Sequence, residues 1–149
     1  MAIIRPARPS DAEELSTVEH AAYANYVDHA GVRPEPMTED FSPLIGDERV
    51  WVAEHEGAVM GLLVLTTRPD HLLLDSIAVS PDAQGMGIGR RLLEFVEEHA
   101  RAHGLGEVRL YTDEAMTSNI DYYLRRGFVE TRRAVDQGRR RVFFTKHLG

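Results

Sequence analysis

The feature that most constrains the fold of this chain is a glycine-rich segment between a predicted strand and a predicted helix. Residues 71–79 (HLLLDSIAV) are apolar enough for a strand, residues 80–89 (SPDAQGMGIG) form a loop, and an apolar stripe over residues 90–104 indicates a helix. A further strand is predicted over residues 107–112. A helix between two strands carries the chain back along the sheet, so these two strands are expected to lie parallel, joined by a right-handed crossover.

The remaining segments add antiparallel strands to this pair. Three strands in succession before the loop imply a meander, and residues 128–146 form a hairpin across residues 136–138. Ser10 and Glu13 have the spacing of a capping box at the start of the first helix. The expected fold class is α/β (mixed α+β), with a mixed, mostly antiparallel, twisted sheet of about seven strands flanked by about four helices. The strands are predicted over residues 2–5, 49–54, 59–65, 71–79, 107–112, 128–133 and 139–146, and the helices over residues 10–30, 38–46, 90–104 and 118–126.

Composition narrows the classes of function. A chain of 149 residues is expected to form one domain, residues 1–149. The net charge of −7 argues against general binding to nucleic acids. No apolar run approaches the ~20 residues of a membrane span, and the N-terminus lacks the apolar core of a signal peptide, so a cytoplasmic protein with no membrane partner is expected. The absence of cysteine excludes disulfides and a cysteine acyl-enzyme.

The loop has the features of an anion-binding site. The first amides of a helix lack acceptors within the helix, and the helix dipole favours negative charge there. Gly85, Gly87 and Gly89 carry no Cβ, so a diphosphate could lie against the backbone. Arg90 and Arg91 follow in the first turn, where cations oppose the dipole and a bound phosphate would explain them.

Two familiar phosphate-binding motifs do not match this loop well. A P-loop ends in Gly-Lys-Ser/Thr, and the only lysine of the chain is Lys146. A dinucleotide fingerprint has the spacing G-x-G-x-x-G, whereas this loop has G-x-G-x-G. Asp113 is placed for a ribose contact, but the loop follows the fourth strand and does not open the chain. A helix start that binds no ligand is the remaining alternative.

Three motifs resemble a known family. Residues 84–89 (QGMGIG) are similar to the Q/R-x-x-G-x-G/A acyl-CoA loop of the GNAT superfamily of N-acetyltransferases, and they follow a typical preceding strand, residues 75–81 (DSIAVSP). Residues 116–128 (MTSNIDYYLRRGF) resemble the family's Asn…Tyr-x-x-x-Gly-Phe segment, and residues 4–12 resemble its usual start. The resemblance covers essentially the whole chain, with the motifs in the family's order.

The resemblance implies acetyl-CoA as cosubstrate and no metal. Acetyl-CoA would bind where the parallel fourth and fifth strands splay apart, with its pyrophosphate on the amides of residues 84–90. Its pantetheine would pair with the fourth strand, where a backbone N–H would polarise the thioester carbonyl. Asn119 would contact the cofactor arm. The residues expected to bind acetyl-CoA are Ile77, Ala78, Val79, Gln84, Gly85, Met86, Gly87, Ile88, Gly89, Arg90, Asn119 and Tyr123.

The resemblance also implies direct acetyl transfer to a primary amine in a ternary complex, without an acyl-enzyme. Tyr123 stands at the family's tyrosine position and would protonate the departing CoA thiolate. Tyr122 points about 100° away on the helix, so one of the two rings is expected in the core and the other in the cleft. Asp75 has the strand parity of Ile77 and Val79 and is a candidate general base, acting directly or through water. A purely structural, hydrogen-bonding Asp75 is the alternative, as is another acid.

The acceptor side is predicted from the first helix and the segment after it. Glu19, Tyr23 and Tyr26 share one flank of that helix, and Met37 would complete a cover over the acceptor, with a solvated helix edge as the alternative. Residues 1–40 carry three arginines against eight acids, which would attract a cationic amine. A non-catalytic CoA-binding sensor or interaction module is the competing function.

Two clusters elsewhere are expected to be structural. His99 and His103 are four residues apart, like a metal pair, but no third ligand accompanies them, so they are read as cations at a helix C-terminus or residues at the edge of its apolar stripe. Residues 139–141 (RRR) are expected to be exposed, where a phosphate or a second copy of the chain, as in a homodimer, could contact them.

Overall fold

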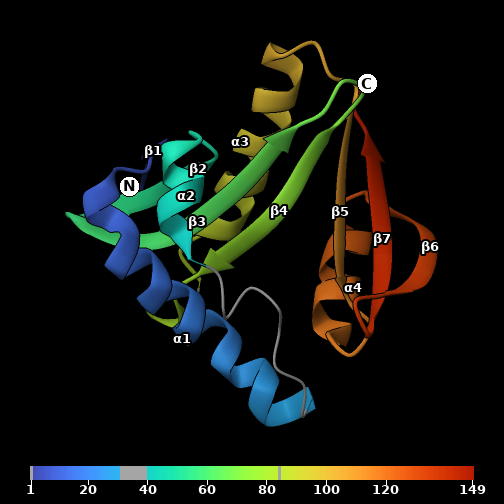
Figure 1. Cartoon of the computed structure of the whole chain (residues 1–149), viewed down its shortest axis with the longest axis horizontal. Coiled ribbons are helices and arrows are strands. Elements are labelled where there is room, and N and C mark those ends of the chain that lie inside the picture. Colours follow the sequence, from blue (N-terminus) through green and yellow to red (C-terminus); the bar gives the residue numbers. More distant parts are fainter. Residues whose placement is uncertain (1, 31–39, 84) are drawn as a thin grey trace.

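Seven strands form one mixed sheet in the computed structural model, which describes residues 2–30, 40–83 and 85–149 (Figure 1). The strand order is β1-β2-β3-β4-β5-β7-β6, and the β4–β5 pair is parallel while the other neighbours are antiparallel. This confirms the predicted fold class. The strands are β1 (Ile3–Pro6), β2 (Val50–His55), β3 (Ala58–Thr67), β4 (Leu72–Val79), β5 (Glu107–Asp113), β6 (Val129–Asp136) and β7 (Arg139–His147), and the helices are α1 (Ala12–Ala30), α2 (Phe41–Gly46), α3 (Ile88–Ala102) and α4 (Thr117–Arg125).

The helices cover the two faces of the sheet through two apolar cores. Consecutive residues of β3 point to opposite faces, so Leu63 belongs to the core beneath α3, with Leu92, while Leu62 belongs to the core beneath α1, with Leu15. Tyr123 of α4 also packs into the α3 core. None of the helices in the described part of the chain combines the length and the apolar character that a bilayer span requires.

A bulge interrupts β4. Val64 of β3 lies opposite Ser76, and Leu65 lies opposite Leu74, so Asp75 is an extra residue with no position opposite it in β3. The side chains of β4 therefore change faces at this point. Even-numbered residues belong to the α3 core before the bulge and odd-numbered residues pack against it afterwards (Leu72 and Leu74, then Ile77 and Val79). The prediction that the side chain of Asp75 lies on the same sheet face as those of Ile77 and Val79 is wrong. As the extra residue of the bulge, Asp75 shifts the alternation of side chains along β4.

The parallel strands separate next to this bulge. β4 and β5 pair at Leu72–Val108 and at Leu73–Arg109, near the start of β4. From there the two strands diverge, with α4 lying along β5 and the start of α3 following the far end of β4 (Figure 1). The divergence opens the sheet between its two halves.

The first helix begins differently from the prediction. Ser10 is not its N-cap, because residues 9–11 form a 3-10 turn and α1 starts at Ala12. The carboxylate of Asp11 accepts the backbone amide of Arg8 at 2.7 Å and the guanidinium of Arg5 at 2.9 and 3.0 Å. The ion pair with Arg5 holds the pKa of Asp11 below its usual range. The capping thus comes from a charged pair that joins β1 to the helix.

The arginine cluster of the β6–β7 hairpin is not uniformly exposed. Arg140 has 78% of its side chain exposed, but Arg141 has only 7%. The guanidinium of Arg141 donates to Asp136 at 2.8 Å and lies 4.4 Å from the centre of the Tyr111 ring. The expectation of exposure is therefore wrong for Arg141, because an acid and an aromatic ring on neighbouring strands cover it.

His99 of α3 extends the aromatic stripe of that helix, and His103, the C-cap of α3, contacts its ring. The ring of His99 lies 4.9 Å from Trp51 of β2, edge to face, and 5.8 Å from Phe95. Burial, and then the charge of His103, lower the pKa of His99. At neutral pH His99 is therefore an uncharged packing residue, which favours the stripe interpretation over that of a helix-terminal cation.

Gly61 allows the start of α3 to pack closely on the sheet. A Cβ at this position would lie 3.1 Å from Ile88 Cγ2 and from Leu92 Cδ1, and 3.2 Å from the carbonyl oxygen of Ala78. Since this packing fixes the helix that follows the glycine-rich loop, the absence of a side chain at Gly61 positions that loop.

We expect Gly61→Val to destabilise the fold by about 1–3 kcal/mol, because overpacking of a filled core costs that much. Chemical denaturation would measure the free energy of unfolding. Gly106→Val is the matched control, since nothing lies within 4 Å of a Cβ at Gly106 and its backbone φ is not positive. Equal stabilities of the two variants would contradict this account of Gly61.

Candidate active site

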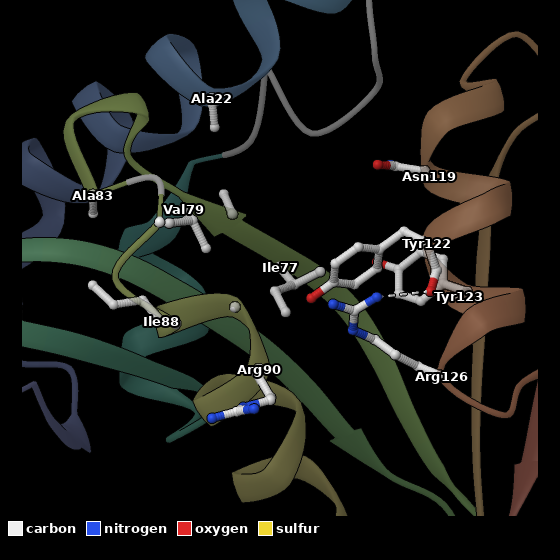
Figure 2. A pocket seen from close by; sticks show the side chains of 14 residues that line it. Ala22, Ile77, Val79, Ala83, Ile88, Arg90, Asn119, Tyr122, Tyr123 and Arg126 are labelled. Carbon is white, nitrogen blue, oxygen red and sulfur yellow. Dashed lines mark hydrogen bonds between the residues drawn. The ribbon is translucent and has the colours of Figure 1, made fainter.

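A cavity of about 630 Å³ lies where β4 and β5 diverge (Figure 2). It is bounded by β4, by the loop and first turn of α3, by α4, and by one residue of α1. The described residues that line it are Ala22, Ile77, Ala78, Val79, Ala83, Gly85, Gly87, Ile88, Gly89, Arg90, Asn119, Tyr122, Tyr123 and Arg126. None of them is an aspartate or glutamate, although the chain carries a net charge of −7.

The three glycines of the loop serve different purposes. Gly85 and Gly87 have φ values of 84° and 74°, in the left-handed region that side chains other than glycine rarely adopt. Gly87 is the N-cap of α3. Gly89 leaves room for Tyr122, because a Cβ there would make a tight contact of 3.1 Å with the hydroxyl oxygen of that residue. At these three positions the loop thus brings backbone without a side chain to the cavity wall.

The first amides of α3 face the same loop. The amide of Arg91 donates to the carbonyl of Gly87 at 3.1 Å. The preceding amides, of Ile88, Gly89 and Arg90, belong to the part of a helix that has no acceptor within it. All three residues line the cavity, so a negatively charged group could bind there.

The two arginines after the loop have different surroundings. Arg90 lines the cavity, but its side chain is 77% exposed and its Nε lies 3.7 Å from Glu94. Arg91 points away and donates to the backbone carbonyl of Ala2. Of the two arginines predicted to bind a phosphate, only Arg90 lines the cavity. Arg91 instead binds the N-terminal segment.

Both adjacent tyrosines of α4 line the cavity, and Tyr123 also belongs to the α3 core, as expected for one of the two rings. Tyr123 is only 6% exposed and packs against Phe128 and Phe144, with ring centres 5.6 and 6.0 Å away. Tyr122 is partly buried, and burial raises the pKa of its phenol, with Arg126 opposing the shift. Both rings extend from α4 toward Ile77 of β4 (Figure 2).

Asp75 does not line the cavity. Its carboxylate accepts the hydroxyl of Thr66 at 2.5 Å and the guanidinium of Arg49 at 3.1 Å. Arg49 also donates to the carbonyl of Leu65 at 3.2 Å. Asp75, the extra residue of the bulge, is thus held by Thr66 of β3 and by Arg49, the residue before β2.

The predicted acceptor residues are only partly described. Glu19 is fully buried under α1, which packs on β3 and β4, so its carboxylate is not a surface charge that attracts a cation. The side chains of Tyr23 and Tyr26 lie outside what the structure describes, as do Met37 and Gln84. Ala22 is the residue through which α1 reaches the cavity. Met86, which is 46% exposed, is not among the lining residues.

Sequence reasoning missed Arg126. Its guanidinium lies 3.5 Å from the centre of the Tyr122 ring and lines the cavity (Figure 2). Residues four apart share a helix face, so its spacing from Tyr122 could have identified it. Within residues 2–30, 40–83 and 85–149, no group of three His, Cys, Asp or Glu side chains is placed to hold a metal ion.

Solved structures with the same fold cover nearly the whole chain. The PaiA N-acetyltransferase of Thermoplasma acidophilum, in complex with coenzyme A, superposes with a TM-score of 0.80 over 99% of both chains at 19% identity. Ard1 of Thermoplasma volcanium superposes with a TM-score of 0.78 over 99% of this chain and 98% of its own, at 20% identity. The TM-scores show that these two proteins share the fold of this chain.

Sequence relatives and a family model show the family. An IAA acetyltransferase of Azospirillum brasilense is 36% identical over 86 residues, which are 56% of each chain. A mycothiol acetyltransferase of Geodermatophilus obscurus is 45% identical over 66 residues, 44% of this chain and 21% of the relative, so these relatives extend well beyond the matched part. The model of the acetyltransferase (GNAT) family matches residues 15–128, which include the glycine-rich loop, Asn119 and both tyrosines. The chain therefore belongs to the GNAT family of acetyltransferases.

Proposed function

We propose that residues 1–149 form one N-acetyltransferase domain that transfers an acetyl group from acetyl-CoA directly to a primary amine. The observation that carries the proposal is the cavity between the diverging strands β4 and β5, which combines helix-start amides, three glycines and two tyrosines. A cytoplasmic protein with no metal requirement is part of the same proposal. The chain has no cysteine, so a ternary complex without a cysteine acyl-enzyme fits its composition.

Acetyl-CoA would bind along β4 toward the bulge. Its pyrophosphate would accept the amides at the start of α3, where the glycines leave the backbone open and the helix dipole favours negative charge. Its pantetheine would run past Ile77 and Val79, which line the cavity on the side where β5 has moved away. A backbone N–H near Ile77 would polarise the thioester carbonyl. Asn119 would contact the arm from α4.

The reaction would proceed by direct attack. An ammonium acceptor first loses a proton, because only the neutral amine has a lone pair. The nitrogen then attacks the thioester carbon and the new C–N bond forms. The nitrogen releases its second proton to solvent, and the C–S bond breaks. Tyr123 donates its phenolic proton to the departing thiolate, and solvent reprotonates the phenolate.

Asp75 would act on the acceptor side. The bulge directs its carboxylate toward Thr66 and Arg49, on the sheet face that α1 and α2 cover. From there it would take the ammonium proton through water, since it does not line the cavity. We place Glu19, which is buried, at the edge of the acceptor region, and Tyr23, Tyr26 and Met37 would complete a cover over the acceptor. A CoA-binding module without catalysis is the competing function.

The proposal is tested by an acceptor screen with acetyl-CoA. We expect at least one class of primary amine, among small amines, amino acids and peptides with a free N-terminus, to stimulate release of CoA. Mass spectrometry should find the acetyl group on the nitrogen. Tight CoA binding without transfer to any amine would favour the sensor, and absence of CoA binding would reject both.

The placement of the pyrophosphate is tested at Gly87. Gly87→Asp and Gly87→Asn add side chains of nearly equal size, and both residues tolerate a positive φ better than most. Only the aspartate adds a negative charge at the loop. We expect Gly87→Asp to bind acetyl-CoA at least about tenfold more weakly than Gly87→Asn, a difference of about 1.4 kcal/mol in calorimetry. Equal affinities of the two folded variants would contradict the placement.

Tyr123 as general acid is tested by removing its hydroxyl. Tyr123→Phe keeps the ring against Phe128 and Phe144 but cannot donate a proton. We expect the single-turnover rate to fall by ~10²–10⁴ while affinity for acetyl-CoA changes little. Tyr122→Phe, the matched variant at the next position, should lose less than about tenfold. A normal rate for Tyr123→Phe would transfer the role to Tyr122 or to water.

A further inference from the structure

Arg126 is a cation in the cavity wall whose charge no described acid neutralises. Its guanidinium has no described carboxylate within 4.0 Å, whereas Arg49, Arg90 and Arg139 each lie within that distance of an acid. The cavity itself has no described aspartate or glutamate in its lining. A positive charge in such a setting favours an anionic ligand, because burial of an unpaired cation is otherwise unfavourable.

The guanidinium of Arg126 is held in place before any ligand arrives. Nη1 donates to the backbone carbonyl of Tyr122 at 3.2 Å, and Cζ of the guanidinium lies 3.5 Å from the centre of the Tyr122 ring. Arg126 is also the C-cap of α4, where the helix dipole stabilises a cation. A guanidinium has five N–H donors, so its contacts with Tyr122 leave further N–H groups available to bind an anion.

The position of Tyr122 brings this cation close to the start of α3. The hydroxyl oxygen of Tyr122 lies 3.1 Å from the place of a Cβ on Gly89, in the first turn of α3. Arg126 lies against the same ring, from the α4 side of the cavity (Figure 2). An anion on the α3 amides would therefore have Arg126 on its other side.

We propose that Arg126 binds a phosphate group of CoA from the α4 wall of the cavity. The proposal rests on the proposed function, since it takes CoA as the ligand. Arg90, the arginine that the sequence favours, is mostly exposed and lies near Glu94, so it is a weaker phosphate ligand. A planar guanidinium suits two oxygens of one phosphate group better than a lysine ammonium does.

The test compares Arg126→Gln with Arg125→Gln by calorimetry with CoA. Arg125 is the neighbouring arginine of the same helix, is exposed and does not line the cavity, so it controls for the loss of one charge. We expect Arg126→Gln to weaken CoA binding by about tenfold or more, and Arg125→Gln to change it less than twofold. The salt dependence of affinity should also become shallower in Arg126→Gln alone, which a purely structural defect would not cause.

The same titrations with 3′-dephospho-CoA identify the phosphate. If the effect of Arg126→Gln disappears with this ligand, Arg126 binds the 3′-phosphate; if the effect persists, it binds the pyrophosphate. Both outcomes support the proposal. Arg126→Lys should recover part of the affinity, and thermal melting should show all variants folded. Unchanged CoA affinity in a folded Arg126→Gln protein would overturn the inference, whereas a wild-type protein that does not bind CoA would overturn the proposed function.

Discussion

The early separation of β4 from β5 is the constraint on which the rest of the site depends. The strands pair at two positions, Leu72–Val108 and Leu73–Arg109, and the bulge at Asp75 follows directly. Past the bulge, β4 remains paired with β3 while β5 follows β7, so the sheet opens between its halves. The opening is lined from both sides because α3 begins just after β4 and α4 follows β5. A parallel pair that continued along the whole of β4 would fill the space that the cavity occupies.

The sequence was sufficient for the fold because its strongest signals are local. Hydrophobic periodicity, the glycine-rich loop and the turn residues predicted every strand and helix near its observed position. The predictions are wrong where the local structure depends on contacts with segments that are distant in the sequence. The bulge at Asp75 depends on how β3 and β4 fit together, and the helix start depends on the pairing of Asp11 with Arg5 of another strand. Burial of Arg141 likewise requires Tyr111 of a neighbouring strand. A pattern of single residues does not contain these partners.

The chain as a whole is acidic, whereas the charged residues described in the lining of its cavity are arginines. Outside the cavity, several acids are held by arginines from other elements, such as Asp11 by Arg5 and Asp113 by Arg139. The lining contains helix-start amides and arginines but no described acid. Arginines in the lining are compatible with an anionic ligand even though the chain as a whole is acidic. Overall acidity argues against general binding to nucleic acids, but it does not argue against a local phosphate site.

The absence of a side chain at Gly89 bears on the packing of Tyr122 as well as on the space at the loop. From the sequence, the third glycine of the loop provides room for a diphosphate. In the structure, the hydroxyl of Tyr122 already approaches the place of its Cβ at 3.1 Å, and the ring of Tyr122 supports the guanidinium of Arg126. A side chain at Gly89 would crowd this hydroxyl and oblige it to shift. The third glycine of the loop therefore matters to the packing of α3 against α4, whether or not a ligand lies on the loop.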